Sequence, residues 1–164
     1  MKEKKLTLKS NKKIGIVYRL HSQPAVKMAN QLAEKLKRRG YKIFTAPEQK
    51  QLPHTDLLIS SNDLKQMSLV IVLGGDGTYL RAVRLLRGHP VPILGFNMGF
   101  LGFLTAHSID EVFETVDQTL KNKMVVHSRA RLHADVKLKS GKRVQFDALN
   151  DIVIERGSFS QLIS

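Results

Sequence analysis

The sequence predicts an α/β fold: a Rossmann-like, open and mostly parallel sheet with flanking helices, followed by the start of an antiparallel β-rich second domain. Residues 69–73 are five consecutive apolar residues, which is typical of a strand buried on both faces in a parallel sheet. A glycine turn and a helical pattern follow this strand directly. Near residue 124 helical spacing gives way to alternation. These patterns predict an α/β domain at 1–123 and an incomplete β-rich domain at 124–164.

The α/β part is expected to begin with a strand, a helix and a second strand. Residues 14–18 are mostly apolar, and a helix from Pro24 to about Arg39 carries apolar side chains at helical spacing. The basic last turn and Gly40 are typical of a helix C-terminus. A strand at 41–44 completes a βαβ unit, whose crossover is almost always right-handed.

The middle of the chain continues this alternation. Residues 47–67 contain two prolines and predict a loop with a short helix. After the strand at 69–73 we expect a helix at 79–87 and a short strand at 91–96, whose Pro92 indicates an irregular start.

A helix is then expected from Ser108, because Glu111 stands three residues later as in a capping box. Residues 131–138 and 144–149 alternate around a turn and predict an antiparallel hairpin. A further strand is expected at 150–157. Because the sequence stops soon afterwards, we expect a fragment, or a protein whose second domain is cut short.

Composition indicates an ordinary globular protein. The chain has 164 residues, no cysteine and a net charge of +13. Cysteine chemistry is therefore excluded, and no apolar run approaches the roughly 18 residues of a membrane span. We expect a cytoplasmic protein with no membrane partner. The positive charge suits polyanions, but the basic residues are dispersed and aromatic residues are few, so no nucleic-acid partner is expected.

The sequence Gly74-Gly75-Asp76-Gly77-Thr78 is the candidate site. It follows a buried strand and precedes a helix, which places it at the carboxyl end of the sheet, where open α/β folds bind ligands. Neither the dinucleotide fingerprint nor the P-loop is present, since Leu80 stands where the third glycine belongs and no Gly-Lys-Ser/Thr follows.

Two interpretations of this turn remain open. In the structural one, the glycines form a tight turn that needs positive φ angles, and Asp76 is the helix N-cap. In the functional one, the helix terminus keeps Asp76 ionised beside a phosphate-sized gap. Its carboxylate would then orient or deprotonate a hydroxyl that attacks a phosphoryl group.

Other candidate residues are weaker. Arg81 either turns back towards a phosphate or lies on a solvated helix face. The six histidines show no ligand spacing, so no protein metal site is expected.

Two further motifs make a resemblance specific. Gly74-Gly75-Asp76-Gly77-Thr78 is shared by a kinase superfamily that includes NAD kinases and diacylglycerol and sphingosine kinases. The stretch from Asn97 to Thr105 (Asn-Met-Gly-Phe-Leu-Gly-Phe-Leu-Thr) closely resembles the second motif of bacterial NAD kinases, and residues 148–154 look like the third. The three motifs stand in the family's order and span nearly the whole chain.

The resemblance implies transfer of a phosphoryl group from ATP or polyphosphate to the adenosine-ribose 2′-hydroxyl of NAD, which gives NADP. Asp76 would be the general base, and a divalent ion such as Mg²⁺ would ride on the donor. The residues that the resemblance places against the dinucleotide or nucleotide are Gly75, Asp76, Gly77, Arg81, Asn97, Phe103, Asn150 and Asp151.

Within that set, Gly77 would lie against the dinucleotide, Phe103 near the adenine, and Asn150 and Asp151 on NAD hydroxyls. Asp151 stands where many members carry glutamate. The family's β-rich second domain carries much of the NAD pocket, so residues 1–164 alone are expected to turn over NAD poorly or not at all. A homo-oligomer is expected at full length.

Two other classes stay open at this point. A lipid kinase shares the glycine turn but leaves the second and third motifs unexplained. A non-catalytic nucleotide- or nucleic-acid-binding module would suit the positive charge and the missing domain.

Overall fold

The computed structural model describes residues 3–58, 61–99, 102–149 and 151–153. The chain divides into two compact units, Met1–Ser128 and Arg129–Ser164. The boundary expected after residue 123 stays a prediction. No helix among the described residues is both long and apolar enough to cross a membrane.

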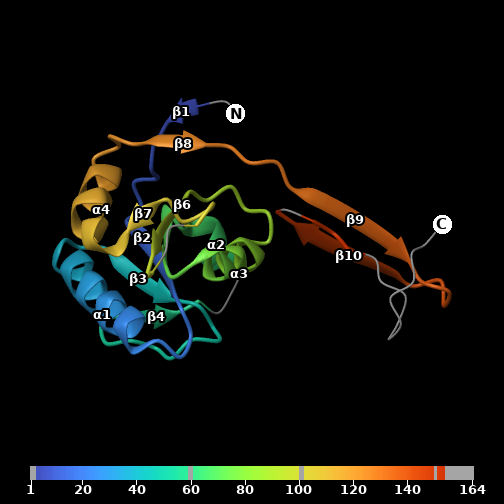
Figure 1. Ribbon diagram of the computed structural model, residues 1–164, viewed down its shortest axis with the longest axis horizontal. Helices are drawn as coiled ribbons and strands as arrows, with labels where there is room; N and C mark the ends of the chain where they lie inside the picture. Colours follow the sequence, from blue (N-terminus) through green and yellow to red (C-terminus); the bar gives the residue numbers. More distant parts are fainter. Residues whose placement is uncertain (1–2, 59–60, 100–101, 150, 154–164) are drawn as a thin grey trace. The chain divides into compact units, whose positions relative to one another are not determined.

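A parallel sheet forms the centre of the first unit (Figure 1). In the described part of the chain it has six strands in the order β4 (Asp56–Leu57), β3 (Lys42–Thr45), β2 (Lys13–Tyr18), β5 (Leu69–Leu73), β6 (Ile93–Asn97) and β7 (His107–Ser108). All neighbouring pairs are parallel. From β2 the chain adds β3 and β4 on one side. It then returns to place β5 on the other side of β2, and β6 and β7 follow beyond β5. The predicted Rossmann-like sheet is therefore confirmed, with its switch point between β2 and β5.

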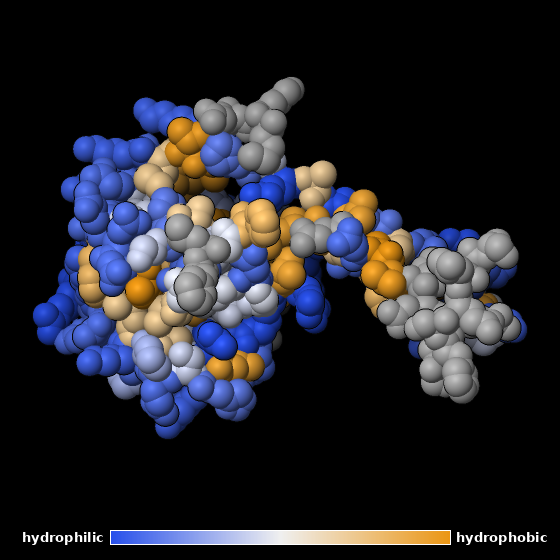
Figure 2. All heavy atoms as spheres, viewed as in Figure 1, coloured by the Kyte–Doolittle hydropathy of each residue, from blue (hydrophilic) through white to orange (hydrophobic). Residues whose placement is uncertain are grey.

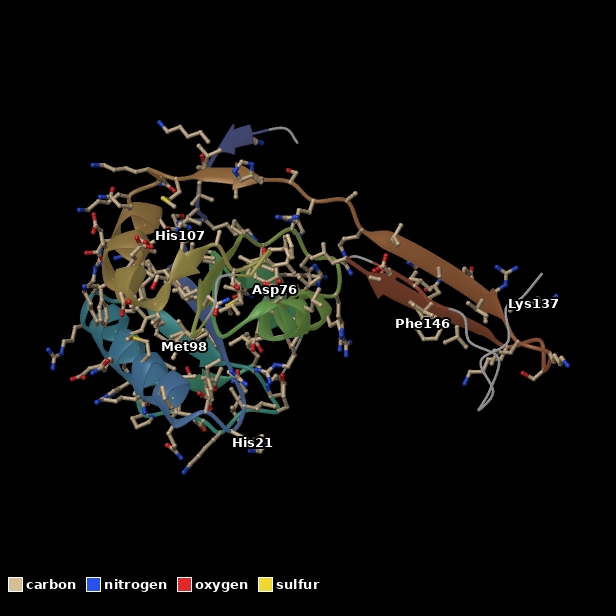
Figure 3. The ribbon with its side chains drawn as sticks, viewed as in Figure 1. His21, Asp76, Met98, His107, Lys137 and Phe146 are labelled. Carbon is tan, nitrogen blue, oxygen red and sulfur yellow. The ribbon has the colours of Figure 1, made fainter. Side chains whose placement is uncertain are left out.

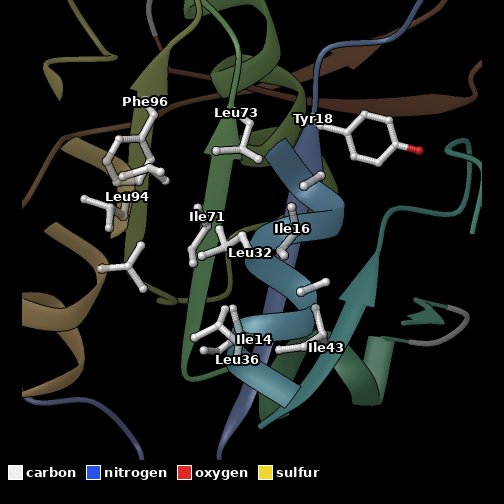
Figure 4. Close-up of a cluster of buried hydrophobic side chains, with 14 of the residues drawn as sticks. Ile14, Ile16, Tyr18, Leu32, Leu36, Ile43, Ile71, Leu73, Leu94 and Phe96 are labelled. Atoms are coloured by element: carbon white, nitrogen blue, oxygen red, sulfur yellow. The ribbon is translucent and has the colours of Figure 1, made fainter. Parts of the chain in front are cut away.

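Helices cover both faces of this sheet. Helix α1 (Gln23–Arg38) and helix α4 (Val112–Leu120) pack on one face, and α2 (Ser61–Gln66) and α3 (Asp76–Leu86) contribute to the other. Strand β5 contributes side chains to the apolar core on both faces of the sheet. Ile71 lies in the same buried cluster as Leu32 of α1 (Figure 4), whereas Val72 lies in the same buried cluster as Ala82 of α3. The uninterrupted apolar run thus reflects burial on two sides.

Local structure differs from the sequence prediction at several helix and strand ends. Helix α3 begins at Asp76, inside the glycine turn, and not at residue 79. Ser108 caps a 3-10 turn, η1 (Ile109–Glu111), because its hydroxyl accepts a hydrogen bond from the Asp110 N–H, and α4 follows this turn. The two-residue strands β4 and β7 were not predicted.

The first unit also contains a small antiparallel pair. Strand β1 (Glu3–Lys5) pairs with β8 (Val125–His127), and the Leu6 N–H donates to the Met124 carbonyl at 3.0 Å. Leu6 is buried. This pairing joins segments about 120 positions apart, which no local pattern shows.

The second unit contains the predicted hairpin, β9 (Leu132–Lys137) and β10 (Arg143–Ala148). Its register pairs Leu132 with Ala148, Ala134 with Phe146 and Val136 with Val144, so one face is apolar. The other face carries the ion pairs of Asp147 with His133 and of Asp135 with Arg143. Leu132 and Phe146 are exposed, and orange surface follows the hairpin in Figure 2.

The strand expected at 150–157 is only partly testable. Residues 151–153 are described and belong to no strand, which contradicts that part of the prediction. Residues 150 and 154–157 lie outside the described residues.

The two-sided burial of β5 predicts a graded cost of truncation. Ile71→Val should lower the free energy of unfolding by about 0.5–1.5 kcal/mol, and Ile71→Ala by about 2–5 kcal/mol, because each deletion leaves a cavity. Val125 is 51% exposed on β8, so Val125→Ala should cost no more than about 0.5 kcal/mol. Urea unfolding measures all three. Equal costs for Ile71→Ala and Val125→Ala would contradict the assigned core.

Candidate active site

The glycine turn lies at the carboxyl edge of the sheet, between β5 and α3. The Gly74 N–H donates to the Phe96 carbonyl at 2.9 Å, which ties the turn to β6. Gly75 is the N-cap of α3 with φ −92°, and Asp76 is the first residue of the helix. The expected N-cap role of Asp76 is therefore wrong.

The glycines of this turn are explained by the space around them and not by a need for positive φ angles. Among the described residues, the glycines with positive φ are Gly40, Gly88 and Gly141, so the positive angles expected in this turn are absent. A Cβ at Gly74 would lie 2.4 Å from the Thr78 hydroxyl oxygen. A Cβ at Gly75 or Gly77 would meet no described atom within 4 Å. Gly74 is thus required by packing, whereas Gly75 and Gly77 border open space.

The Asp76 side chain is labelled in Figure 3. Its carboxylate binds the second glycine-rich stretch. Its Oδ2 accepts the Phe103 N–H at 3.0 Å. Its Oδ1 accepts the Leu104 N–H at 3.1 Å, the Thr105 N–H at 3.2 Å and the Thr105 hydroxyl at 3.1 Å. The side chain therefore joins the loop after β5 to the loop after β6.

These bonds lower the pKa of Asp76. Loss of hydration by itself would raise the pKa of the carboxyl group. The hydrogen bonds from Leu104, Phe103 and Thr105 favour the ionised form and outweigh that effect, so the pKa of Asp76 lies below the ordinary value of an aspartate. Asp76 is a carboxylate at neutral pH.

Gly102 leaves the space that the carboxylate occupies. A Cβ at residue 102 would lie 2.3 Å from Asp76 Oδ1 and 2.7 Å from its Cγ. The second glycine-rich stretch thus needs a glycine there because another residue's side chain fills the position.

Asn97 fixes the same stretch from β6. Its side-chain NH₂ donates to the Thr105 hydroxyl at 2.9 Å, and its side-chain oxygen accepts the Gly99 N–H at 2.8 Å. Asn97 and Thr105 are both buried. The polar atoms of the Asn97 amide are therefore engaged within the protein.

Phe103 places its backbone and its ring in different surroundings. Its N–H binds Asp76, but the residue is 95% exposed. The backbone is thus held by the carboxylate, whereas the aromatic ring is left as an exposed apolar surface.

Arg81 is neither free on the helix surface nor directed at Asp76. Its Nη2 donates to the Tyr18 carbonyl at the end of β2, and its Nε lies 3.3 Å from the Glu48 carboxylate. The geometry of that second contact is an ion pair and not a hydrogen bond, which leaves Nε buried without a hydrogen-bond acceptor.

The remaining predicted residues belong to the second unit. Asp151 is exposed and lies in no strand. Asn150 lies outside the described residues. In the described part of the chain, no group of three histidine, aspartate or glutamate side chains could hold a metal ion.

The contact of Asp76 with Gly102, Leu104 and Thr105 was missed by the sequence analysis, as was Glu48. All four residues are distant in sequence from their partners. The presence of Gly102 and Thr105 in the second motif was the available sign of a site, but their spacing does not show that they contact Asp76.

Comparisons with known proteins agree with one another. A protein-family model described as "ATP-NAD kinase N-terminal domain" matches residues 14–124. The NAD kinase of Bdellovibrio bacteriovorus is 53% identical over 99% of this chain and 54% of its own length. That of Geobacter sp. strain M21 is 38% identical over 93% of this chain and 54% of its own. The chain thus spans about half the length of the curated relatives it matches.

A solved structure also matches. It is described as yeast NADH kinase complexed with NADH, and it superimposes with a TM-score of 0.73 over 85% of this chain and 44% of the yeast chain. The sequences are 20% identical, so this likeness shows the fold alone.

Gly102→Ala tests the contact between the two loops. The added Cβ should displace the Asp76 carboxylate and lower the free energy of unfolding by about 1–3 kcal/mol. The matched control is Gly99→Ala, where the nearest described atom would be 3.9 Å from the new Cβ. Its expected cost is below about 1 kcal/mol. Equal stability of both variants in thermal unfolding would contradict the packing at Gly102.

Proposed function

The chain belongs to the NAD kinase family and corresponds to the N-terminal part of its members. We propose that it carries the catalytic base of an enzyme that makes NADP from NAD. The donor is ATP or polyphosphate, and the acceptor is the 2′-hydroxyl of the adenosine ribose. Asp76 accepts the hydroxyl proton, the hydroxyl oxygen forms a bond to the terminal phosphorus, and the bond from that phosphorus to the leaving oxygen breaks.

The ionised carboxylate of Asp76 at the start of α3 is the observation that carries this proposal. Four hydrogen bonds from the described residues hold it in one orientation at the carboxyl edge of the sheet. Phosphoryl transfer depends mainly on positioning and on electrostatic stabilisation. A fixed carboxylate supplies the first of these for the attacking hydroxyl.

The open space beside Gly75 and Gly77 supports the position of the dinucleotide. No described atom would meet a Cβ at either residue, so the main chain is accessible there. The backbone N–H groups at the start of α3 also favour negatively charged groups. We assign this space to the ribose and phosphates of the substrate.

Other residues complete the proposed contacts. Phe103 offers its exposed ring to the adenine. Asn150 and Asp151 are assigned to NAD hydroxyls. Asn97 acts on the ligand through the stretch that it holds, because its amide atoms bind Thr105 and Gly99. Arg81 reaches a phosphate only by leaving Glu48.

The wider setting is part of the same proposal. The divalent ion arrives with the phosphates of the donor, as part of that substrate. A β-rich domain that begins after residue 123 completes the NAD pocket, and the full-length enzyme is a cytoplasmic homo-oligomer.

Asp76→Asn tests the activity. We join residues 1–164 to the C-terminal half of the Bdellovibrio bacteriovorus relative and couple NADP formation to a dehydrogenase. The wild-type chimera should form NADP, and Asp76→Asn should lower kcat by a factor of about 100 or more, since general-base catalysis contributes about that much. Because the asparagine NH₂ cannot accept the Phe103 N–H, calorimetry with NAD is run on the same variant, so that loss of the base is distinguished from loss of substrate binding. A folded wild-type chimera without activity, or an active Asp76→Asn chimera, would count against the proposal.

Gly77→Ala tests the position of the substrate. The methyl group meets no described atom and alanine favours the helix, so the free energy of unfolding should stay unchanged or rise by up to about 1 kcal/mol. NADP formation by the chimera should nevertheless fall about tenfold or more, because the methyl group displaces the ligand. Arg84→Ala, on an exposed position of α3, should change neither quantity. Full activity of Gly77→Ala would place the substrate elsewhere.

A further inference from the structure

The two oxygens of the Asp76 carboxylate differ in their hydrogen bonds. A carboxylate oxygen has about two lone-pair positions. From the described residues Oδ1 accepts three hydrogen bonds, from the Leu104 N–H, the Thr105 N–H and the Thr105 hydroxyl. Oδ2 accepts one, from the Phe103 N–H. Oδ1 is therefore saturated, whereas Oδ2 keeps room for one more donor.

The direction of the Thr105 hydroxyl follows from its neighbours. The Asn97 oxygen accepts the Gly99 N–H, so the Asn97 NH₂ faces Thr105 and can only donate. An ionised carboxylate can only accept. The hydroxyl must then accept from Asn97 and donate its own proton to Asp76 Oδ1. A single chain of oriented bonds thus runs from Gly99 through Asn97 and Thr105 to Asp76.

We propose that Thr105 is a positioning residue of the kinase reaction. Through Asn97 and Thr105, the second glycine-rich stretch holds Oδ1 of Asp76 in place. Oδ2 is then left to accept the proton of the attacking hydroxyl. This inference rests on the proposed function. Thr105 is buried and touches no reacting atom in this arrangement. Its effect on the reaction is exerted through the orientation and the pKa of Asp76.

Hydrogen bonds, rather than nearby charges, surround the Asp76 carboxylate. Of the residues on the contacting stretch, Gly102, Phe103, Leu104 and Thr105, none titrates. On its own helix Arg81 is paired with Glu48, and beyond Thr105 the His107 ring packs on Phe96 with ring centres 5.8 Å apart. The ion pairs of the described residues do not include Asp76. Hydrogen bonds, and not a neighbouring charge, are what favour its ionised form.

Thr105→Val removes the hydroxyl at nearly constant volume, and Thr105→Ser keeps it. A titration of the Asp76 carboxyl carbon by NMR, on residues 1–164 without substrate, should give a higher midpoint for Thr105→Val than for wild type. Thr105→Ser should match wild type. The sign follows because a donor to the ionised form is lost, so protonation becomes easier. Thr105→Ala makes the same comparison if Thr105→Val does not fold.

The same variants in the chimera test the reaction. Thr105→Val should lower kcat about tenfold, the usual scale for a lost hydrogen bond to a charged group, with KM for NAD within about threefold. The acid limb of its kcat profile should move to higher pH. A gain in basicity does not offset this loss, because a loose phosphoryl transition state depends little on early proton removal.

The outcomes separate the two proposals. An unchanged titration midpoint in Thr105→Val overturns the anchor, and a shifted midpoint with unchanged kcat overturns the positioning role. If the folded wild-type chimera makes no NADP, the proposed function fails and the catalytic role of Thr105 fails with it. The titration then still shows whether the Thr105 hydroxyl lowers the pKa of Asp76.

Discussion

The hydrogen bonds between the Asp76 carboxylate and residues 103–105 are the interaction on which the site depends. Strands β5 and β6 are parallel neighbours, so the loops that follow them leave the sheet at the same edge. The Gly74 N–H bond to the Phe96 carbonyl brings the two loops together, and the carboxylate then joins them. Burial of the strands explains where the loops begin. Among the described residues, the Asp76 contacts and the Asn97 bonds to Gly99 and Thr105 hold the second loop against the first.

The glycines around Asp76 fall into two physical groups. Gly74 and Gly102 leave no room for a Cβ, and at Gly95 a Cβ would lie 3.0 Å from the Tyr79 ring. Gly75 and Gly77 face no described atom within 4 Å, although helix formation would favour a larger residue at Gly77. Packing therefore does not explain the glycines at positions 75 and 77. The proposed place of the substrate is the part of the motif that the fold leaves open.

The sequence was informative wherever a pattern is local. The apolar run of β5, the amphipathic α1 and the alternating hairpin are local patterns, so the fold class, the four central strands of the sheet and the hairpin were predicted. The start of α3 was missed because Gly77 is a poor helix former, and β4 and β7 are too short for a period to show. The site was predicted only as a carboxylate among glycines. Its partners Gly102, Leu104 and Thr105 lie 26 to 29 positions away, and no spacing rule connects them to Asp76.

The bonds that orient Asp76 also fix the conditions under which it can act. Because they favour the ionised form, the pKa of the folded protein's Asp76 lies below that of the unfolded chain. Their contribution to stability is therefore complete above the ordinary aspartate pKa and is lost as the pH falls through the lowered one. Across the physiological range Asp76 is both fully charged and fully bonded. A carboxylate of low pKa is a weak base. In the proposed phosphoryl transfer, however, a loose transition state depends first on an oriented acceptor, and these four bonds supply that orientation.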